Sequence, residues 1–318
     1  MKLVTSILAA SLVAAGTTRA GAQVIRPPRL DSIRAIALDS LGANATVYFR
    51  PEYRHRAAQV QALLTHFVDF AREHLDIDMR MRAAVLDSAD WSRVTSVPYG
   101  LPTNSGAGSD NLLLAAAKPP ERVGGRIMPT GLLSDFLTVG HEGGHLLTWQ
   151  LLPDALKSAA AAREPPSPEV IARFRALSQM PAWYWEMVAS YFATAFLRET
   201  RPQGADAWLH HLREIANVPR PRFHSLDDWS SRVMEATTAD STPYRFSEEG
   251  GLNQGWYQGV VGQLAAHIHD RAGLALVHHV RSTLAAPSPP TTEELVTQLE
   301  TIAPGSTMVL TRLGAEWR

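Results

Sequence analysis

The sequence His141-Glu142-Gly143-Gly144-His145 constrains the fold of this chain more than any other feature. Residues four apart lie on the same face of an α-helix, so both imidazoles can reach one metal ion. Glu142 is turned by about 100° from His141, where its carboxylate can reach a water molecule at the metal without binding the metal. The pattern therefore predicts a helix carrying a metal site, with Glu142 as the general base that deprotonates the water.

The surroundings of this motif are mostly apolar, and they predict a helix over residues 132–152 that ends at Pro153. Gly143 and Gly144 are unexpected inside such a helix, because each glycine costs it about 1 kcal/mol relative to alanine. Two adjacent glycines indicate that something approaches the helix closely at this point.

A third ligand is expected, since a catalytic zinc site usually has three protein ligands and one open position. The chain has no cysteine, so the ligands must be histidines and carboxylates. Glu186 is the sole charge in the apolar run of residues 180–197, and an isolated buried carboxylate is costly unless it is paired or bound to a metal. We therefore expect Glu186 to be the third ligand, with a place on the helix surface as the alternative. The competing acids lie in polar or proline-rich settings: Glu164, Glu169 and Glu199.

The chain resembles the gluzincin class of zinc peptidases in six residues: His141, Glu142, His145, Glu186, Ala189 and Tyr191. The nearest likeness is a peptidase-MA-like bacterial domain spanning about residues 41–285. The resemblance implies that Zn2+ is held by His141, His145 and Glu186, with water as the fourth ligand. It also implies hydrolysis of a peptide or similar amide bond, in which Glu142 acts first as base and then as acid to the leaving amine.

Gluzincins also supply a tyrosine or histidine that stabilises the oxyanion, and residues 253–259 resemble the Y-x-x-G segment that opens the corresponding helix. Counting back from Gly259 places Trp256 in the tyrosine position, whereas counting back from Gly273 favours Tyr257. A phenol can serve this role better than an indole, so the resemblance implies Tyr257. An aromatic residue of the core is the alternative interpretation.

Two further segments bear on substrate binding through the same resemblance. Residues 111–117 stand where gluzincins place the edge strand that binds substrate. Residues 106–111 stand where aminopeptidases carry G-x-M-E-N, whose glutamate binds the free amine of the substrate. Ser109 and Asp110 replace the methionine and the glutamate, so exopeptidase activity is not expected.

The order of predicted elements favours an α+β fold. Strands are predicted at residues 45–49, 83–86 and 111–117, and an amphipathic helix at residues 55–74. After residue 129 the patterns are helical, so we expect a zincin-like fold in which a small mixed sheet with a helix precedes a mostly helical subdomain. Residues 23–125 and 126–318 would then form one catalytic unit with the zinc cleft between them.

The first 22 residues are typical of a Sec signal peptide. Lys2 precedes an apolar run from Leu3 to Ala15, and Ala20-Gly21-Ala22 is a suitable cleavage site. We expect cleavage near Ala22, a secreted or periplasmic protein, and no stable membrane insertion afterwards. Lys and Arg total 30 against 31 Asp and Glu, so no excess of positive charge points to nucleic acid. The expected partner is a peptide or protein substrate, and the sequence leaves the oligomeric state open.

Two other functions fit the same motif. One is a non-catalytic binding or scaffold protein that keeps a zincin fold, and the other is a gluzincin that acts on a non-peptide substrate. Glu142 argues against the scaffold, because a merely structural site needs no base.

Overall fold

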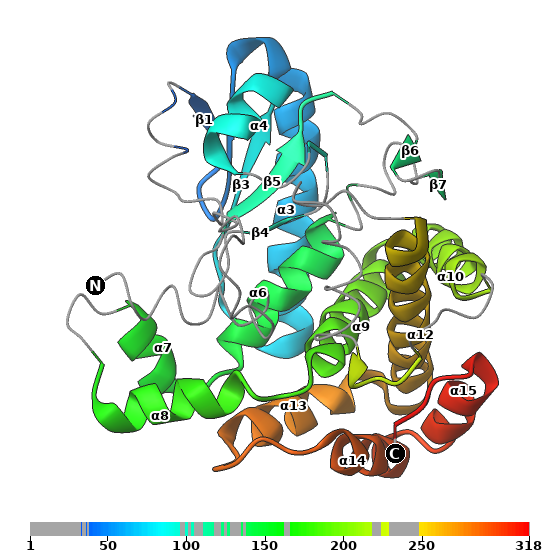
Figure 1. Ribbon diagram of the computed structural model, residues 1–318. Helices are drawn as coiled ribbons and strands as arrows, with labels where there is room; N and C mark the ends of the chain where they lie inside the picture. Colours follow the sequence, from blue (N-terminus) through cyan, green and yellow to red (C-terminus); the bar gives the residue numbers. More distant parts are fainter. Residues whose placement is uncertain are drawn as a thin grey trace, which may run out of the picture.

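The computed structural model of the chain describes Ile33, Ile36 and the ranges 38–95, 99–100, 103–104, 111–117, 122–123, 126–127, 135, 138–161, 166–217, 224–228 and 248–317. The predicted signal peptide and Ser109–Asp110 lie outside these residues. Figure 1 shows a sheet with α3 and α4 at one end of the molecule and the remaining helices at the other.

The sheet has five strands in the order β1-β2-β3-β5-β4. The three central strands β2, β3 and β5 run parallel, and the edge strands β1 and β4 run antiparallel to their neighbours. The strands are β1 (Asp39–Leu41), β2 (Ala45–Phe49), β3 (Met81–Leu86), β4 (Thr103–Asn104) and β5 (Asn111–Ala115). The predicted α+β fold with a small mixed sheet is confirmed. The expectation that residues 111–117 form an edge strand is wrong, because β4 pairs with β5 at Leu112 and Leu113.

Helix α3 (Arg54–Leu75) connects the parallel strands β2 and β3 and covers one face of the sheet. Alternate strand residues point to opposite faces, so Val47, Ala83 and Leu112 pack in the core on the α3 side. Ala84 and Leu113 instead join a smaller cluster that includes helix α4 (Ser88–Val94). The sheet is thus covered by apolar side chains on both faces.

The second half of the chain is helical. Its elements are a π-helical turn (Thr138–Glu142), α6 (Gly143–Gln150), α7 (Asp154–Ala161), α8 (Pro168–Leu177), α9 (Ala182–Thr200), α10 (Pro202–Ala216), α12 (Glu248–Ala272), a 3-10 turn (Gly273–Ala275), α13 (Leu276–Ala285), α14 (Thr292–Ile302) and α15 (Ser306–Leu313). Two smaller elements lie in the first half of the chain. A 3-10 turn (Pro51–Tyr53) precedes α3, and β6 (Arg122–Val123) pairs with β7 (Arg126–Ile127) in a separate two-stranded sheet. Among the described helices, none is long and apolar enough to cross a bilayer.

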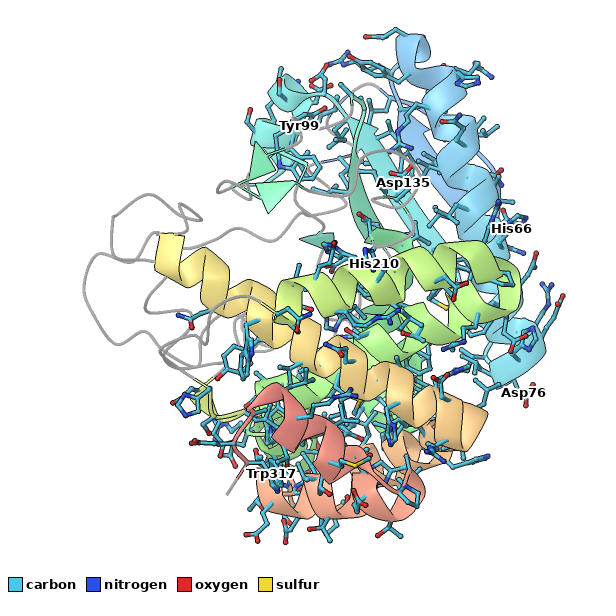
Figure 2. All side chains as sticks on the ribbon, turned by 90° about the vertical axis from the view of Figure 1, so that its right-hand side faces the viewer. His66, Asp76, Tyr99, Asp135, His210 and Trp317 are labelled. Atoms are coloured by element: carbon cyan, nitrogen blue, oxygen red, sulfur yellow. The ribbon has the colours of Figure 1, made fainter. Side chains whose placement is uncertain are left out.

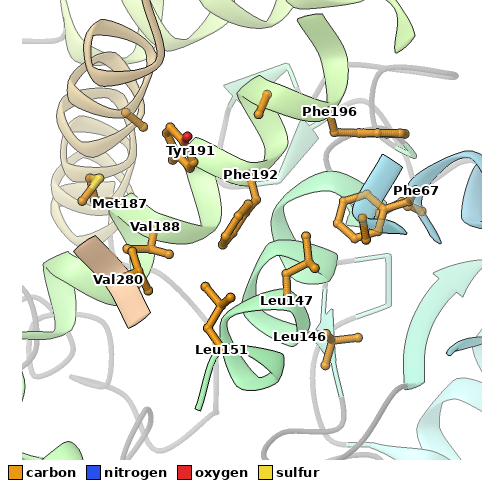
Figure 3. Packing of buried hydrophobic residues seen from close by; sticks show 14 of the residues in the cluster. Phe67, Leu146, Leu147, Leu151, Met187, Val188, Tyr191, Phe192, Phe196 and Val280 are labelled. Carbon is orange, nitrogen blue, oxygen red and sulfur yellow. The ribbon is translucent and has the colours of Figure 1, made fainter. Parts of the chain in front are cut away.

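Helix α9 is the centre of the helical half, because most of its side chains are buried and it packs against α3, α6, α10 and α12. One apolar core continues from α3 through α9 (Figure 3). The rings of Phe67 on α3 and Phe196 on α9 meet edge to face, with centroids 5.0 Å apart. Leu147 of α6 lies close to both helices (Figure 3), so α6 is held between the sheet layer and α9.

Candidate metal centre

His141, His145 and Glu186 come together although they lie on two different helical segments. One nitrogen of each histidine and one carboxylate oxygen of Glu186 all lie within 4.8 Å of one another. The distance from Nε2 of His141 to Oε2 of Glu186 is 3.2 Å, and from Nε2 of His145 to Oε1 of Glu186 it is 3.6 Å. In the part of the chain that the structure describes, this is the one such group of three or more ligand-type side chains. The cluster could therefore hold a metal ion.

Small residues bring the two helical segments into contact. A Cβ atom on Gly144 would lie 2.6 Å from the carbonyl oxygen of Ala189, and one on Gly140 would lie 3.3 Å from Cα of Ala193. Gly140 and Gly144 are four apart, as are Ala189 and Ala193, so the two pairs form a seam along one face of each segment. Glu186 lies one turn before Ala189 and is thereby held beside the histidines.

The close approach expected from the adjacent glycines is confirmed. Gly144 contacts the backbone of α9, and a Cβ atom on Gly143 would lie 2.9 Å from the ring of Phe67 on α3. The motif is thus enclosed between α9 and α3, where larger side chains would not fit.

His141 and Glu142 lie in the π-helical turn, and His145 lies in the regular helix α6 that follows. The predicted helix is found from Thr138 onward and ends at Gln150, two residues before its expected end. π-Helices are rare, mostly take the form of single turns within α-helices, and are frequently found at functional sites. The two imidazole rings are nearly perpendicular, with an interplanar angle of 88° and centroids 5.0 Å apart.

An ion pair fixes the start of this segment. Asp135, which precedes the π-helical turn, lies beside α3 and the strands (Figure 2) and forms a two-point ion pair with Arg56 of α3. Arg56 also donates a hydrogen bond of 3.5 Å to the carbonyl of Ala115, at the end of β5. Asp135, three residues before the π-helical turn, is therefore paired with α3, and Arg56 links it to the end of β5.

The charges of the cluster favour an anionic carboxylate. Burial opposes ionisation of Glu186, but the neighbouring His145 and His141 outweigh it and lower the pKa of Glu186 to about 2. Burial lowers the pKa of His145, whereas the pKa of His141 is raised because contact with Glu186 outweighs its burial. All three side chains are largely buried: the exposed fraction is 14% for His141, 12% for His145 and 17% for Glu186. Two imidazoles and one ionised carboxylate form a donor set that suits Zn2+ and related divalent ions.

Ser190 contacts the ring nitrogen of His141 that does not face Glu186. Its Oγ lies 3.3 Å from Nδ1 of His141, and its side chain is fully buried. When Nδ1 carries the proton and donates it to the Oγ of Ser190, Nε2 keeps a lone pair that could bind a metal ion, and such a partner for the second ring nitrogen is usual for metal-binding histidines. We did not predict this role for Ser190 from the sequence. The available signal was its position four residues after Glu186, on the same face of α9.

Glu142 lies next to His141 and is half-buried. Its charge contributes to the raised pKa of His141. The competing acids are placed elsewhere: Glu169 is exposed in the first turn of α8, Glu199 is exposed near the end of α9, and Glu164 lies outside the described residues.

Tyr257 has a different partner from the one that the resemblance implied. Its hydroxyl donates a hydrogen bond to the carbonyl of Ser225, and its side chain is fully buried. Burial also raises its pKa. It is the next residue, Gln258, whose amide reaches Glu186, at 3.0 Å from Oε2. We therefore assign Tyr257 to the anchoring of α12, and we do not include it in the proposed mechanism.

A cavity of about 320 Å³ lies away from the cluster, between α13 and α14. It is lined by polar and small side chains that include His279, Ser282, Thr283 and Glu294. It contains none of the three ligand-type residues, so the chemistry of the chain is better sought at the cluster.

Comparison of the chain with models of protein families, with curated proteins and with solved structures finds no significant match. The assignment of function therefore depends on the geometry of the cluster itself.

Proposed function

We propose that this chain is a zinc-dependent hydrolase of the gluzincin type, with a zincin-like fold, that cleaves peptide bonds. The observation that carries the proposal is the convergence of His141, His145 and Glu186, with their ligand atoms all within 4.8 Å of one another. Glu142 follows His141 directly, in the position of a general base rather than a ligand. Because a signal peptide is predicted at residues 1–22, we propose that the protein acts outside the cytoplasm.

The chain's own residues supply binding, orientation and proton transfer. His141, His145 and Glu186 would hold the zinc ion, and Ser190 would keep His141 in the correct tautomer. When bound, zinc supplies the Lewis acidity that makes water a competent nucleophile near neutral pH. The carboxylate of Glu142 takes the proton that the attacking water loses and then delivers it to the nitrogen of the leaving amine.

The decisive experiment compares wild type with Glu142→Gln on a diverse library of quenched fluorescent peptides, both proteins loaded with zinc. Glutamine keeps the size of Glu142 but cannot accept a proton. We expect the variant to keep its zinc and lose about 10²–10⁴-fold in kcat, with little change in KM. Glu199→Gln is the matched control, because Glu199 is exposed near the end of α9, and it should cleave like wild type.

Two outcomes would contradict the proposal. If Glu142→Gln cleaved as fast as wild type, the assigned base would be wrong. If zinc-loaded wild type cleaved no peptide, a zincin-fold scaffold or a hydrolase of non-peptide substrates would account better for the cluster.

A further inference from the structure

The two carboxylate oxygens of Glu186 have different surroundings. Oε2 accepts a hydrogen bond of 3.0 Å from Nε2 of Gln258 and lies 3.2 Å from Nε2 of His141. Oε1 lies 3.6 Å from Nε2 of His145. The carboxylate is therefore oriented by a contact from α12 as well as by the two histidines.

The position of Gln258 is set by its neighbours on α12. Tyr257 is held by the carbonyl of Ser225, and successive helix residues are turned by about 100°, so Gln258 points in a different direction from Tyr257. Helix α12 packs along α9, and this brings Gln258 to Glu186. A Cβ atom on Gly259 would lie 2.7 Å from the backbone nitrogen of Ala216, so α12 is also in close contact with α10. The helix is thereby fixed on two sides.

A glutamine is well suited to this place. Its amide donates to the carboxylate without adding a positive charge, so Glu186 keeps its full negative charge for a cation. A lysine or arginine there would form an ion pair with Glu186 and compete with a metal. The hydrogen bond also satisfies one of the acceptor positions of a carboxylate that is largely removed from water.

We infer that Gln258 is a positioning residue of the metal site, which holds the carboxylate of Glu186 in the orientation that faces His141 and His145. This inference rests on the proposed metal-binding function, and it adds a support from α12 to the ligands in the π-helical turn, α6 and α9. Outer hydrogen-bond partners of this kind commonly change metal affinity by about 10–100-fold when they are removed.

The test measures the zinc dissociation constant by competition with a chelator. Gln258→Met removes the amide and keeps the length of the side chain, and we expect it to weaken zinc binding by about 10–100-fold. Gln263→Met is the matched control on the same helix, because the amide nitrogen of Gln263 has no hydrogen-bond partner among the residues described here. The control should bind zinc like wild type. Both metal-free variants should fold, as measured by circular dichroism, and the loss of the hydrogen bond to Glu186 should lower the melting temperature of Gln258→Met only.

The visible absorption spectrum of the cobalt-loaded proteins gives a second readout, which a purely structural role would not change. It should be altered in Gln258→Met and unchanged in Gln263→Met. If Gln258→Met does not fold, Gln258→Asn, whose amide is too short to reach Glu186, takes its place with the same expected loss. Wild-type zinc affinity and an unchanged cobalt spectrum in the Gln258 variant would overturn this inference alone. A wild type that binds neither metal would overturn the proposed function itself.

Discussion

The two histidines of the cluster differ in how they are held. His141 has a partner at each ring nitrogen, Ser190 at Nδ1 and Glu186 at Nε2. His145 instead lies beside the other oxygen of Glu186, and burial lowers its pKa. Ser190 is therefore the uncharged residue that contacts the ring of His141, and we expect it to fix the orientation of that ring.

Removal of the Ser190 hydroxyl tests this dependence. In Ser190→Ala, the Nδ1 proton of His141 loses its acceptor, and we expect zinc affinity to fall by about tenfold with little change in melting temperature. Thr194→Val is the matched control, since the hydroxyl of Thr194 binds the carbonyl of Ser190 within α9 and does not reach His141. Equal zinc affinity in Ser190→Ala and Thr194→Val, measured by chelator competition, would show that Ser190 does not orient the ligand.

The three residues of the cluster could be predicted from the sequence, whereas the residues that hydrogen-bond to them could not. The spacing of His141 and His145 follows from helix geometry, and Glu186 was evident as the lone charge of an apolar run. Ser190 and Gln258 are uncharged, and their roles arise only when α9 and α12 pack together. For the same reason, the sequence could not show which side of α12 faces the metal ligands: it was used to compare Trp256 with Tyr257, and the contact of Gln258 with Glu186 was not predicted.

At the scale of elements, the seam between the motif helix and α9 sets the geometry of the site. The backbones approach closely at Gly144 and Ala189, and slightly less closely at Gly140 and Ala193. Gly144 was noted in the sequence, together with Gly143, as a cost to the helix, but Gly140 was not. The residues that contact these glycines could not be named before the packing was known.

Alanine substitutions should distinguish the two glycines of the seam. In Gly144→Ala the new methyl group would meet the backbone of Ala189 at 2.6 Å, which cannot be relieved by a side-chain rotation. We expect the free energy of unfolding to fall by about 1–3 kcal/mol and zinc binding to weaken. In Gly140→Ala the contacts of 3.3 Å need only a small shift, and the gain in helix propensity of about 1 kcal/mol offsets it. Urea denaturation that showed Gly144→Ala to be as stable as Gly140→Ala would contradict this account of the seam.

At the scale of the whole molecule, the central architecture could be predicted and its edges could not. The β2 and β5 strands and helix α3 have clear apolar patterns, whereas β1 and β4 are short, mostly polar strands without one. Strand β4 pairs with β5, and no local sequence pattern predicts this pairing. One core joins the sheet to the helices, so the cluster is supported by both halves of the chain.

The most direct test of the account is the zinc content of the purified, dialysed protein, measured by mass spectrometry of the metal. We expect one zinc ion per chain in wild type and in Glu142→Gln, because Glu142 is not a ligand. His141→Ala and His145→Ala should lose the ion. His210→Ala should retain it, since His210 lies on the surface of α10 (Figure 2) and pairs with Glu214. Stoichiometric zinc in either ligand variant, or no zinc in wild type, would contradict the assignment.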